Sequence, residues 1–349
     1  MKTKVFALYN NKGGVSKTTT TFNLAVYLSE PDNVPKKSVK VLLIDADSQA
    51  NMTELFFASD PKFWDSSSDE LPGDSILDVL KPRLEGSASR VDVSKIDLLV
   101  NKKYQNLYLL RGDINFSAMA EGYFSSSVEQ AITSNVNQKN TYLCLRRLVK
   151  DLIDVYKFDY VIFDLGPSTG AISRLALLAC DGYFVPVTPD RFSALAVKSL
   201  PVVIAEWFKH DKLILSTMSP YGLESDYKEP VFCGAISQQF QVHKGKIKKS
   251  YERWAEKIET QLRLGFLENK DIPSKTLSNN SAIVARIENL GPVVPVAQMV
   301  GKAIFDISQE DTKFASSNGQ MYYGAVFDPW LEKIKQYRAE MAKLVGALK

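Results

Sequence analysis

The feature that most constrains the fold is a short loop near the N-terminus, NKGGVSKT, at residues 11–18. An apolar run with strand character (residues 4–9) precedes it, and an amphipathic helical pattern (residues 17–29) follows it. A glycine-containing loop that leads from a strand into a helix presents backbone N–H groups and the positive end of the helix dipole to an anion. The loop therefore predicts an α/β protein with a phosphate-binding site at the start of its first helix.

Each residue of this loop is a candidate nucleotide contact. Lys17 is expected to reach the β- and γ-phosphates, and the hydroxyl of Thr18 is placed to ligate Mg²⁺. The standard pattern G-x-x-x-x-G-K-[ST] is not met literally, because Asn11 and Ser16 occupy the positions of its two glycines. A chance glycine turn followed by Lys-Thr is the alternative interpretation. The predicted nucleotide-binding residues are Asn11, Lys12, Gly13, Gly14, Val15, Ser16, Lys17, Thr18 and Thr19.

Two further apolar runs end in carboxylates and argue against coincidence. The run at residues 39–45 ends in Asp45, with Asp47 two residues later, and the run at 159–164 ends in Asp164. Because ligands of parallel sheets bind beyond the carboxyl ends of the strands, these acids should lie at the same edge as the loop. A carboxylate there can hold Mg²⁺ through water or position an attacking water molecule. The order of the three motifs predicts a Mg²⁺-dependent nucleotide site.

Strand and helix patterns alternate along the chain. Strands are predicted at residues 4–9, 39–45, 106–110, 159–164, 182–187 and 231–236, several of them apolar at nearly every position. Helices are predicted at residues 17–29, 141–156, 170–179, 193–209 and 246–264. This alternation predicts a mostly parallel, doubly wound sheet flanked by helices. We expect residues 1–349 to form a single domain with lengthened loops at about 58–73 and 265–290.

Composition excludes several other classes of protein. Hydrophobic residues make up 45% and charged residues 24% of the chain, which is ordinary for a globular protein. Three widely spaced cysteines and two histidines form no pattern of metal ligands or disulfides. No apolar stretch is long enough to span a bilayer, and the N-terminus lacks a signal peptide, so a cytoplasmic protein is expected.

The sequence resembles the ParA/MinD/Soj family of deviant Walker A ATPases. Residues 12–19 (KGGVSKTT) resemble the family's phosphate loop, with its extra lysine at the start, and residues 43–51 (LIDADSQAN) resemble its second motif. Weaker similarity is found at residues 106–113 (NLYLLRGD), 164–167 (DLGP), 185–195 (VPVTPDRFSAL) and 299–305 (MVGKAIF). Gln49, Asn51 and the 185–195 stretch are closer to the ParA branch than to MinD. The loop begins within the first dozen residues, which argues against the long ParA type with an N-terminal helix-turn-helix.

The resemblance implies roles for individual residues. Lys12 would cross an ATP-sandwiched dimer to the phosphates of the other subunit, as an arginine finger does elsewhere. Asp47 would position the hydrolytic water. Asp45 and Asp164 would serve the magnesium shell, with Thr18 as the direct ligand. Lys12, Lys17 and Asp47 are thus the predicted catalytic residues.

The resemblance also implies a function for the whole chain. It indicates a Mg²⁺-dependent ATP hydrolase that dimerises with ATP, binds DNA non-specifically at the nucleoid and drives plasmid or chromosome partitioning with a centromere-binding, ParB-like partner. The alternatives are a MinD-like ATPase that cycles on a membrane and a nucleotide-dependent scaffold with little turnover.

Two positions depart from the family: Ser16 replaces the commoner glycine, and Gly166 stands where the first of two prolines is usual. Both changes are expected to alter rate or loop stiffness.

Two segments nearer the C-terminus indicate what else the protein could bind. Residues 241–257 carry a net charge of +4, which exceeds the +3 of the whole chain. The predicted non-specific DNA contacts are Lys244, Lys246, Lys248, Lys249 and Arg253. A merely solvated helix face is the alternative. Residues 330–349 have an amphipathic helical pattern, which suits a helix packed on the protein body or, less well, a membrane-binding helix.

Overall fold

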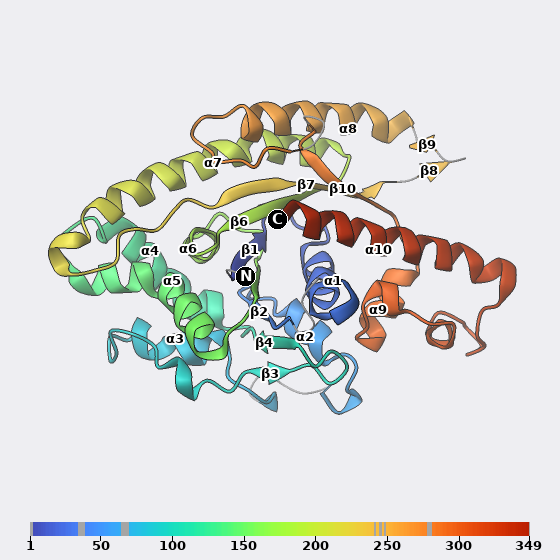
Figure 1. Cartoon of the computed structure of the whole chain (residues 1–349), viewed down its shortest axis with the longest axis horizontal. Coiled ribbons are helices and arrows are strands. Elements are labelled where there is room, and N and C mark those ends of the chain that lie inside the picture. The colour runs from blue at the N-terminus through green and yellow to red at the C-terminus, as the bar shows by residue number, and fades with distance from the viewer. Residues whose placement is uncertain are drawn as a thin grey trace.

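The computed structural model describes residues 3–33, 39–63, 70–240, 242–243, 246–247, 249–277 and 281–348. Its centre is an eight-stranded sheet with the strand order β10-β7-β6-β1-β5-β2-β4-β3 (Figure 1). Neighbouring strands run parallel, and the short edge strand β3 pairs antiparallel with β4. The strands are β1 (Lys4–Leu8), β2 (Val41–Asp45), β3 (Leu99–Val100), β4 (Leu107–Leu110), β5 (Tyr160–Asp164), β6 (Gly182–Val187), β7 (Val231–Phe240) and β10 (Ile283–Glu288).

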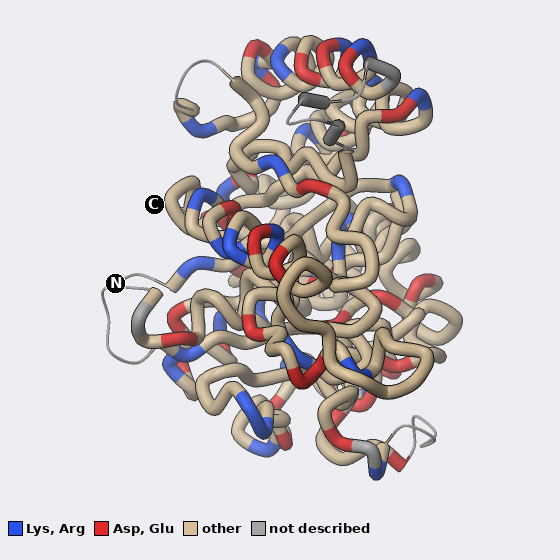
Figure 2. The backbone as a smooth tube through the Cα atoms, turned by 90° about the vertical axis from the view of Figure 1, so that its right-hand side faces the viewer, with Lys and Arg blue, Asp and Glu red and all other residues tan. Residues whose placement is uncertain are grey.

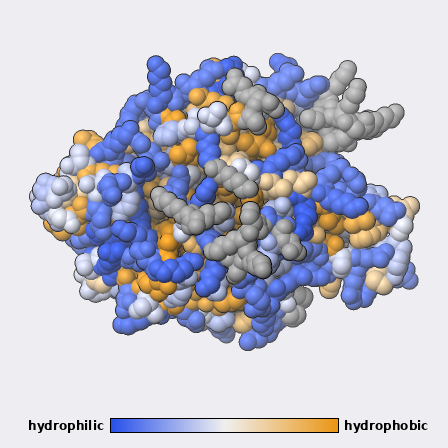
Figure 3. Space-filling model, viewed as in Figure 1, coloured by the Kyte–Doolittle hydropathy of each residue, from blue (hydrophilic) through white to orange (hydrophobic). Residues whose placement is uncertain are grey.

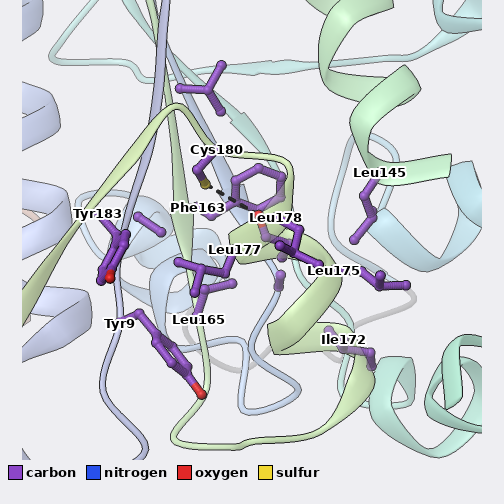
Figure 4. Packing of buried hydrophobic residues seen from close by; sticks show 14 of the residues in the cluster. Tyr9, Leu145, Phe163, Leu165, Ile172, Leu175, Leu177, Leu178, Cys180 and Tyr183 are labelled. Carbon is purple, nitrogen blue, oxygen red and sulfur yellow. Dashed lines mark hydrogen bonds between the residues drawn. The ribbon is translucent and has the colours of Figure 1, made fainter. Parts of the chain in front are cut away.

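Helices cover both faces of the sheet, and β1 shows why its strands are apolar at nearly every position. Val5, Ala7 and Tyr9 pack into a core with helices α3 to α8, whereas Phe6 and Leu8 pack into a second core with α1, α2, α9 and α10. Figure 4 shows part of the first core, in which the Cys180 thiol contacts a backbone carbonyl of α6. The helices are α1 (Lys17–Ser29), α2 (Asn51–Phe57), α3 (Ile76–Leu84), α4 (Phe116–Gln130), α5 (Val136–Tyr156), α6 (Ala171–Leu178), α7 (Arg191–Ser216), α8 (Lys249–Leu262), α9 (Val293–Val300) and α10 (Asp328–Leu348).

The predicted fold class is confirmed, and two details are corrected. The range 265–290, predicted as a loop, contains β10, which pairs with β7 and extends the sheet by one strand. The helix predicted from residue 246 begins at Lys249, because Lys246–Ile247 instead forms a short antiparallel hairpin with Val242–His243. In both places a sequence without a clear strand pattern adopts strand structure through pairing with a neighbour rather than through its own periodicity.

The C-terminal helix α10 packs on the body of the protein. Its apolar side chains, including Trp330, Ile334 and Met341, are buried in the second core against α1 and β10. Hydrophilic side chains cover most of the face seen in Figure 3, with apolar ones in separate patches between them. Within the described ranges, no helix combines the length and apolar character that crossing a bilayer requires.

Candidate nucleotide-binding site

A cavity of about 770 Å³ opens at the carboxyl edge of the sheet, where the loop after β1 enters α1. The predicted loop residues 13–19 line it, together with Asp47 from the segment after β2. The other lining residues are Gln49, Asn51, Glu54, Leu55, Ala58, Pro167, Gln298 and Met299. The structure thus brings the first two sequence motifs to one cavity, as their positions after parallel strands predict.

The loop takes backbone conformations that few residues adopt. Gly14 has a φ of 72° and Ser16 a φ of 57°, both in the left-handed region. Glycine enters this region freely, which explains Gly14. Ser16, which immediately precedes the first residue of α1, has a Cβ atom and therefore lacks this freedom.

Lys17 is buried at the floor of the loop, with only 7% of its surface exposed. Its ammonium group donates hydrogen bonds to the backbone carbonyls of Asn10 and Lys12, each at 3.0 Å. Burial lowers the pKa of Lys17, while the nearby carboxylates of Asp164 and Asp47 act in the opposite direction. A buried cation that faces a cavity is suited to a phosphate group.

Lys12 is held differently from Lys17, although both belong to the same loop. Its ammonium group forms an ion pair with Asp190 at 2.6 Å and also donates to the hydroxyls of Thr188 (2.9 Å) and Ser193 (3.0 Å). The described residues that line the phosphate cavity do not include Lys12. The two lysines therefore lie in separate places, one inside the cavity and one at the start of α7.

Asp45 and Asp164 are side by side at the ends of the adjacent strands β2 and β5. Burial raises the pKa of both carboxyl groups above the ordinary range for aspartate, and the charge of Asp45 raises that of Asp164 further. Asp45 accepts hydrogen bonds from the backbone N–H (2.9 Å) and hydroxyl (2.7 Å) of Thr53. Neither buried oxygen of Asp164 has a well-formed hydrogen bond among the described residues, although the hydroxyl of Thr18 lies close enough to lower the pKa of this carboxyl group. Asp164 is thus the less completely hydrogen-bonded of the two acids, and Thr18 connects it to the cavity.

Asp47 lies against the loop that follows β5. One of its oxygens accepts a hydrogen bond from the backbone N–H of Gln49 at 3.1 Å. A Cβ atom placed on Gly166 would approach that same oxygen to 2.9 Å, closer than real Cβ contacts. The glycine at position 166, where the family usually has proline, therefore leaves room for the carboxylate of Asp47.

This close approach leads to a prediction for Gly166→Ala. The added methyl group should displace Asp47. If Asp47 positions the attacking water, as the resemblance implies, ATP hydrolysis should slow by about tenfold, because small displacements of a catalytic group are costly. ATP affinity should change by less than about threefold, since the loop that holds the phosphates is untouched. Steady-state hydrolysis and nucleotide titration measure the two effects.

Gly122→Ala is a matched control, since Gly122 is exposed on α4 and a Cβ atom there would meet nothing within 4 Å. Equal losses of affinity and rate would contradict the explanation.

Sequence reasoning did not assign roles to two groups that the structure places here. Asp190 comes shortly after the end of the buried strand β6, much as Asp45 and Asp164 end β2 and β5, so its position could have identified it. Gln298 and Met299 reach the cavity from α9, far along the chain, and nothing in their local sequence indicates this.

The predicted DNA-binding residues lie on another part of the molecule. Lys244 and Lys248 are outside the described residues, and only the backbone is described for Lys246, in β9, and Lys249, at the start of α8. Arg253 is exposed on α8. This helix, at the top of Figure 2, contains acidic as well as basic residues.

Comparisons with known proteins agree with this geometry. Residues 3–216 match the model of the AAA_31 family, an AAA domain. A ParA family protein of Chlamydia trachomatis is 28% identical over 58% of this chain and 65% of its own length. The chromosome-partitioning ATPase Soj of Treponema pallidum is 26% identical over 55% of this chain and 59% of its own length. The chain thus spans less than two thirds of the length of either relative.

Solved structures show the same fold over nearly the whole chain. Apo McdA from Cyanothece has a TM-score of 0.63 at 17% identity and covers 99% of this chain and 100% of its own. The septum site-determining protein MinD from Pyrococcus horikoshii, complexed with Mg-ADP, has a TM-score of 0.52 at 17% identity and covers 99% of each chain. The chain therefore belongs to the AAA_31 family of P-loop ATPases, of the ParA/Soj/MinD type with a deviant Walker A loop.

Proposed function

We propose that this chain binds and hydrolyses ATP with Mg²⁺, dimerises around ATP, and binds DNA without sequence preference to drive the partitioning of a plasmid or chromosome. The observation that carries the proposal is the separation of the two loop lysines. Lys17 faces the phosphate cavity of its own chain, whereas Lys12 is held outside that cavity by Asp190. A second lysine in this place suits phosphates that belong to another copy of the chain.

The cavity fits a nucleoside triphosphate with Mg²⁺. Thr18 lines the cavity, and the carboxylate of Asp164, which Thr18 contacts, is suited to water molecules around a cation. A bound Mg²⁺ ion would supply positive charge to the phosphates. Asp45, which already accepts two hydrogen bonds from Thr53, would support the magnesium site indirectly. Asp47, which also lines the cavity, would orient the attacking water.

A dimer would use Lys12 in place of an arginine finger. For Lys12 to reach a partner's phosphates, its ion pair with Asp190 would open, and the partner's triphosphate would replace the carboxylate as the negative group. ADP lacks the γ-phosphate, so it offers a weaker replacement. This exchange would make dimerisation respond to the state of the nucleotide.

DNA binding is supported by a groove of about 320 Å³ between α7 and α8. Arg191, Lys198 and Lys257 line it with exposed side chains, and none of them pairs with an acid in the described ranges. Trp254 lies beside them, 5.6 Å from the ammonium group of Lys257. Basic side chains without base-reading partners suit sequence-independent contact with phosphates. Trp254 and Lys257 belong to the basic segment at residues 241–257.

The names of related proteins support the biological role. The Treponema pallidum relative is a chromosome-partitioning ATPase, and the Chlamydia trachomatis relative is a ParA family protein. Partitioning by such an ATPase would call for a ParB-like protein bound to the DNA cargo, and a location on the nucleoid would follow from DNA binding. The membrane-cycling alternative gains no support from α10, because its apolar side is buried.

Random duplex DNA should bind tightly with ATP and much more weakly with ADP, because a dimer presents two basic surfaces at once. The slope of log affinity against log salt should fall by about 0.9 for each phosphate contact removed. Lys198→Ala together with Lys257→Ala should lower this slope and leave ATP hydrolysis without DNA unchanged. Fluorescence anisotropy over a range of salt concentrations measures the slope.

The matched control changes two exposed lysines elsewhere, Lys150→Ala and Lys335→Ala, and should keep the parent slope. A variant with Lys246, Lys248 and Lys249 all changed to alanine tests the neighbouring segment in the same assay. Binding limited to one DNA sequence would refute the proposed DNA surface. So would the parent slope in both the double variant of the groove and the triple variant of the neighbouring segment.

A further inference from the structure

A β-bulge at the end of β7 directs one side chain toward the phosphate-binding loop. Gln238 pairs with Ile287 of β10 and Phe240 pairs with the next residue, Glu288, so Gln239 is the extra residue between them. Its φ of 57° is in the left-handed region. Bulges beside functional sites commonly re-aim a side chain in this way. Here the amide Nε2 atom of Gln239 donates to the hydroxyl of Ser16 at 2.7 Å and lies 3.4 Å from the carbonyl oxygen of Gly14.

The residue that Gln239 holds is itself in an unfavourable conformation. Ser16 has φ 57° and ψ 32°, and its carbonyl accepts the hydrogen bond from Thr20 that closes the first turn of α1. A residue with a Cβ atom adopts this conformation only when its surroundings hold it there. Two residues in left-handed backbone are therefore joined directly by a side-chain hydrogen bond. The family that this chain resembles usually has glycine at position 16, which needs no such restraint.

Gln239 acts on the loop from outside the phosphate cavity. The described residues that line that cavity include Ser16 but not Gln239. Gln239 instead lines an adjoining cavity of about 280 Å³, which shares Ser16 and Thr19 with the first. An effect of Gln239 on phosphate binding would thus pass through Ser16.

We propose that Gln239 is a positioning residue that compensates for the serine at position 16. Its amide fixes the loop at two points, the Ser16 hydroxyl and the Gly14 carbonyl, on either side of the buried residue Val15. The loop's N–H groups then point into the cavity before nucleotide arrives, and binding does not have to order them. This inference rests on the proposed binding of nucleotide at the loop.

A double-mutant cycle between positions 16 and 239 tests the proposal. Gln239→Met keeps the length of the side chain and removes its donor, so it should weaken Mg-ADP binding by about threefold to tenfold, the effect of one or two neutral hydrogen bonds. In a Ser16→Gly background the same change should have less than about a twofold effect, because glycine adopts the left-handed conformation unaided. Isothermal titration with Mg-ADP measures all four proteins as monomers.

The controls separate positioning from general stability. Gln239 is exposed, so Gln239→Met should leave the thermal unfolding midpoint without nucleotide close to that of its own background, the parent or Ser16→Gly. Gln336→Met, at an exposed glutamine on α10, should leave Mg-ADP affinity unchanged in both backgrounds. If Gln239→Met has the same effect in the parent and in the Ser16→Gly background, or no effect in the parent, the positioning role is refuted and the nucleotide site stands. If the parent chain itself does not bind Mg-ADP, the proposed function fails as well.

Discussion

Replacing Asp47 with alanine should slow ATP hydrolysis by a factor of about 10² to 10⁴ and leave ATP binding close to that of the parent. Asp47 lines the phosphate cavity with its carboxylate against Gly166, and it is close enough to Lys17 to affect the pKa of that lysine, although Lys17 donates its hydrogen bonds to backbone carbonyls. Removal of Asp47 should therefore cost the attacking water its orientation without removing a contact to the phosphates. Single-turnover phosphate release and titration with a non-hydrolysable analogue measure the two quantities separately.

A matched control for this experiment is Asp226→Ala, since Asp226 is exposed and distant in sequence from every motif of the site. It should hydrolyse ATP at the parent rate. If Asp47→Ala also does so, Asp47 has been given the wrong role, and the water must be positioned by another group. A loss of binding as large as the loss of rate would instead make Asp47 a binding residue.

Changing Lys12 to alanine should abolish dimerisation with ATP while ADP binding by the monomer persists. Each charge-assisted contact to a phosphate contributes about 1.5–3 kcal/mol, and a two-fold dimer contains two of them. The dimer should therefore weaken by roughly a hundredfold or more. Monomer binding should persist because Lys17, and not Lys12, is the lysine inside the cavity. Light scattering with ATP measures the first effect, and titration with ADP measures the second.

The control here is Lys150→Ala, at an exposed lysine of α5, which should dimerise as the parent does. A Lys12→Ala protein that still dimerises with ATP would refute the contact between subunits. A protein that no longer binds ADP would show that Lys12 serves its own chain's nucleotide.

Much of the fold could be predicted because its central strands are buried on both faces. Such strands are apolar at nearly every position, and all six predicted strands are present in the sheet. The strand β10 was missed because its sequence, IVARIE, alternates with partly exposed positions and follows a polar stretch. Its place in the sheet depends on pairing with β7, which is not a local property of the sequence.

The site was predictable to the extent that it follows from strand ends. Asp45, Asp47 and Asp164 all lie at or just after the carboxyl ends of parallel strands, and the structure places them near the phosphate loop. The contact between Lys12 and Asp190 joins residues far apart in the chain, and the bond from Gln239 to Ser16 depends on a bulge. Neither leaves a periodic pattern in the sequence, so only the three-dimensional arrangement identifies them.

The central claim is that ATP, and not ADP, joins two copies of this chain. Sedimentation velocity of the purified protein with Mg²⁺ and either nucleotide tests it most directly, with Asp47→Ala included to prevent turnover of ATP. We expect a dimer with ATP, a monomer with ADP, and a more persistent ATP dimer for Asp47→Ala. The same sedimentation coefficient with both nucleotides, for the parent and for Asp47→Ala, would contradict the account.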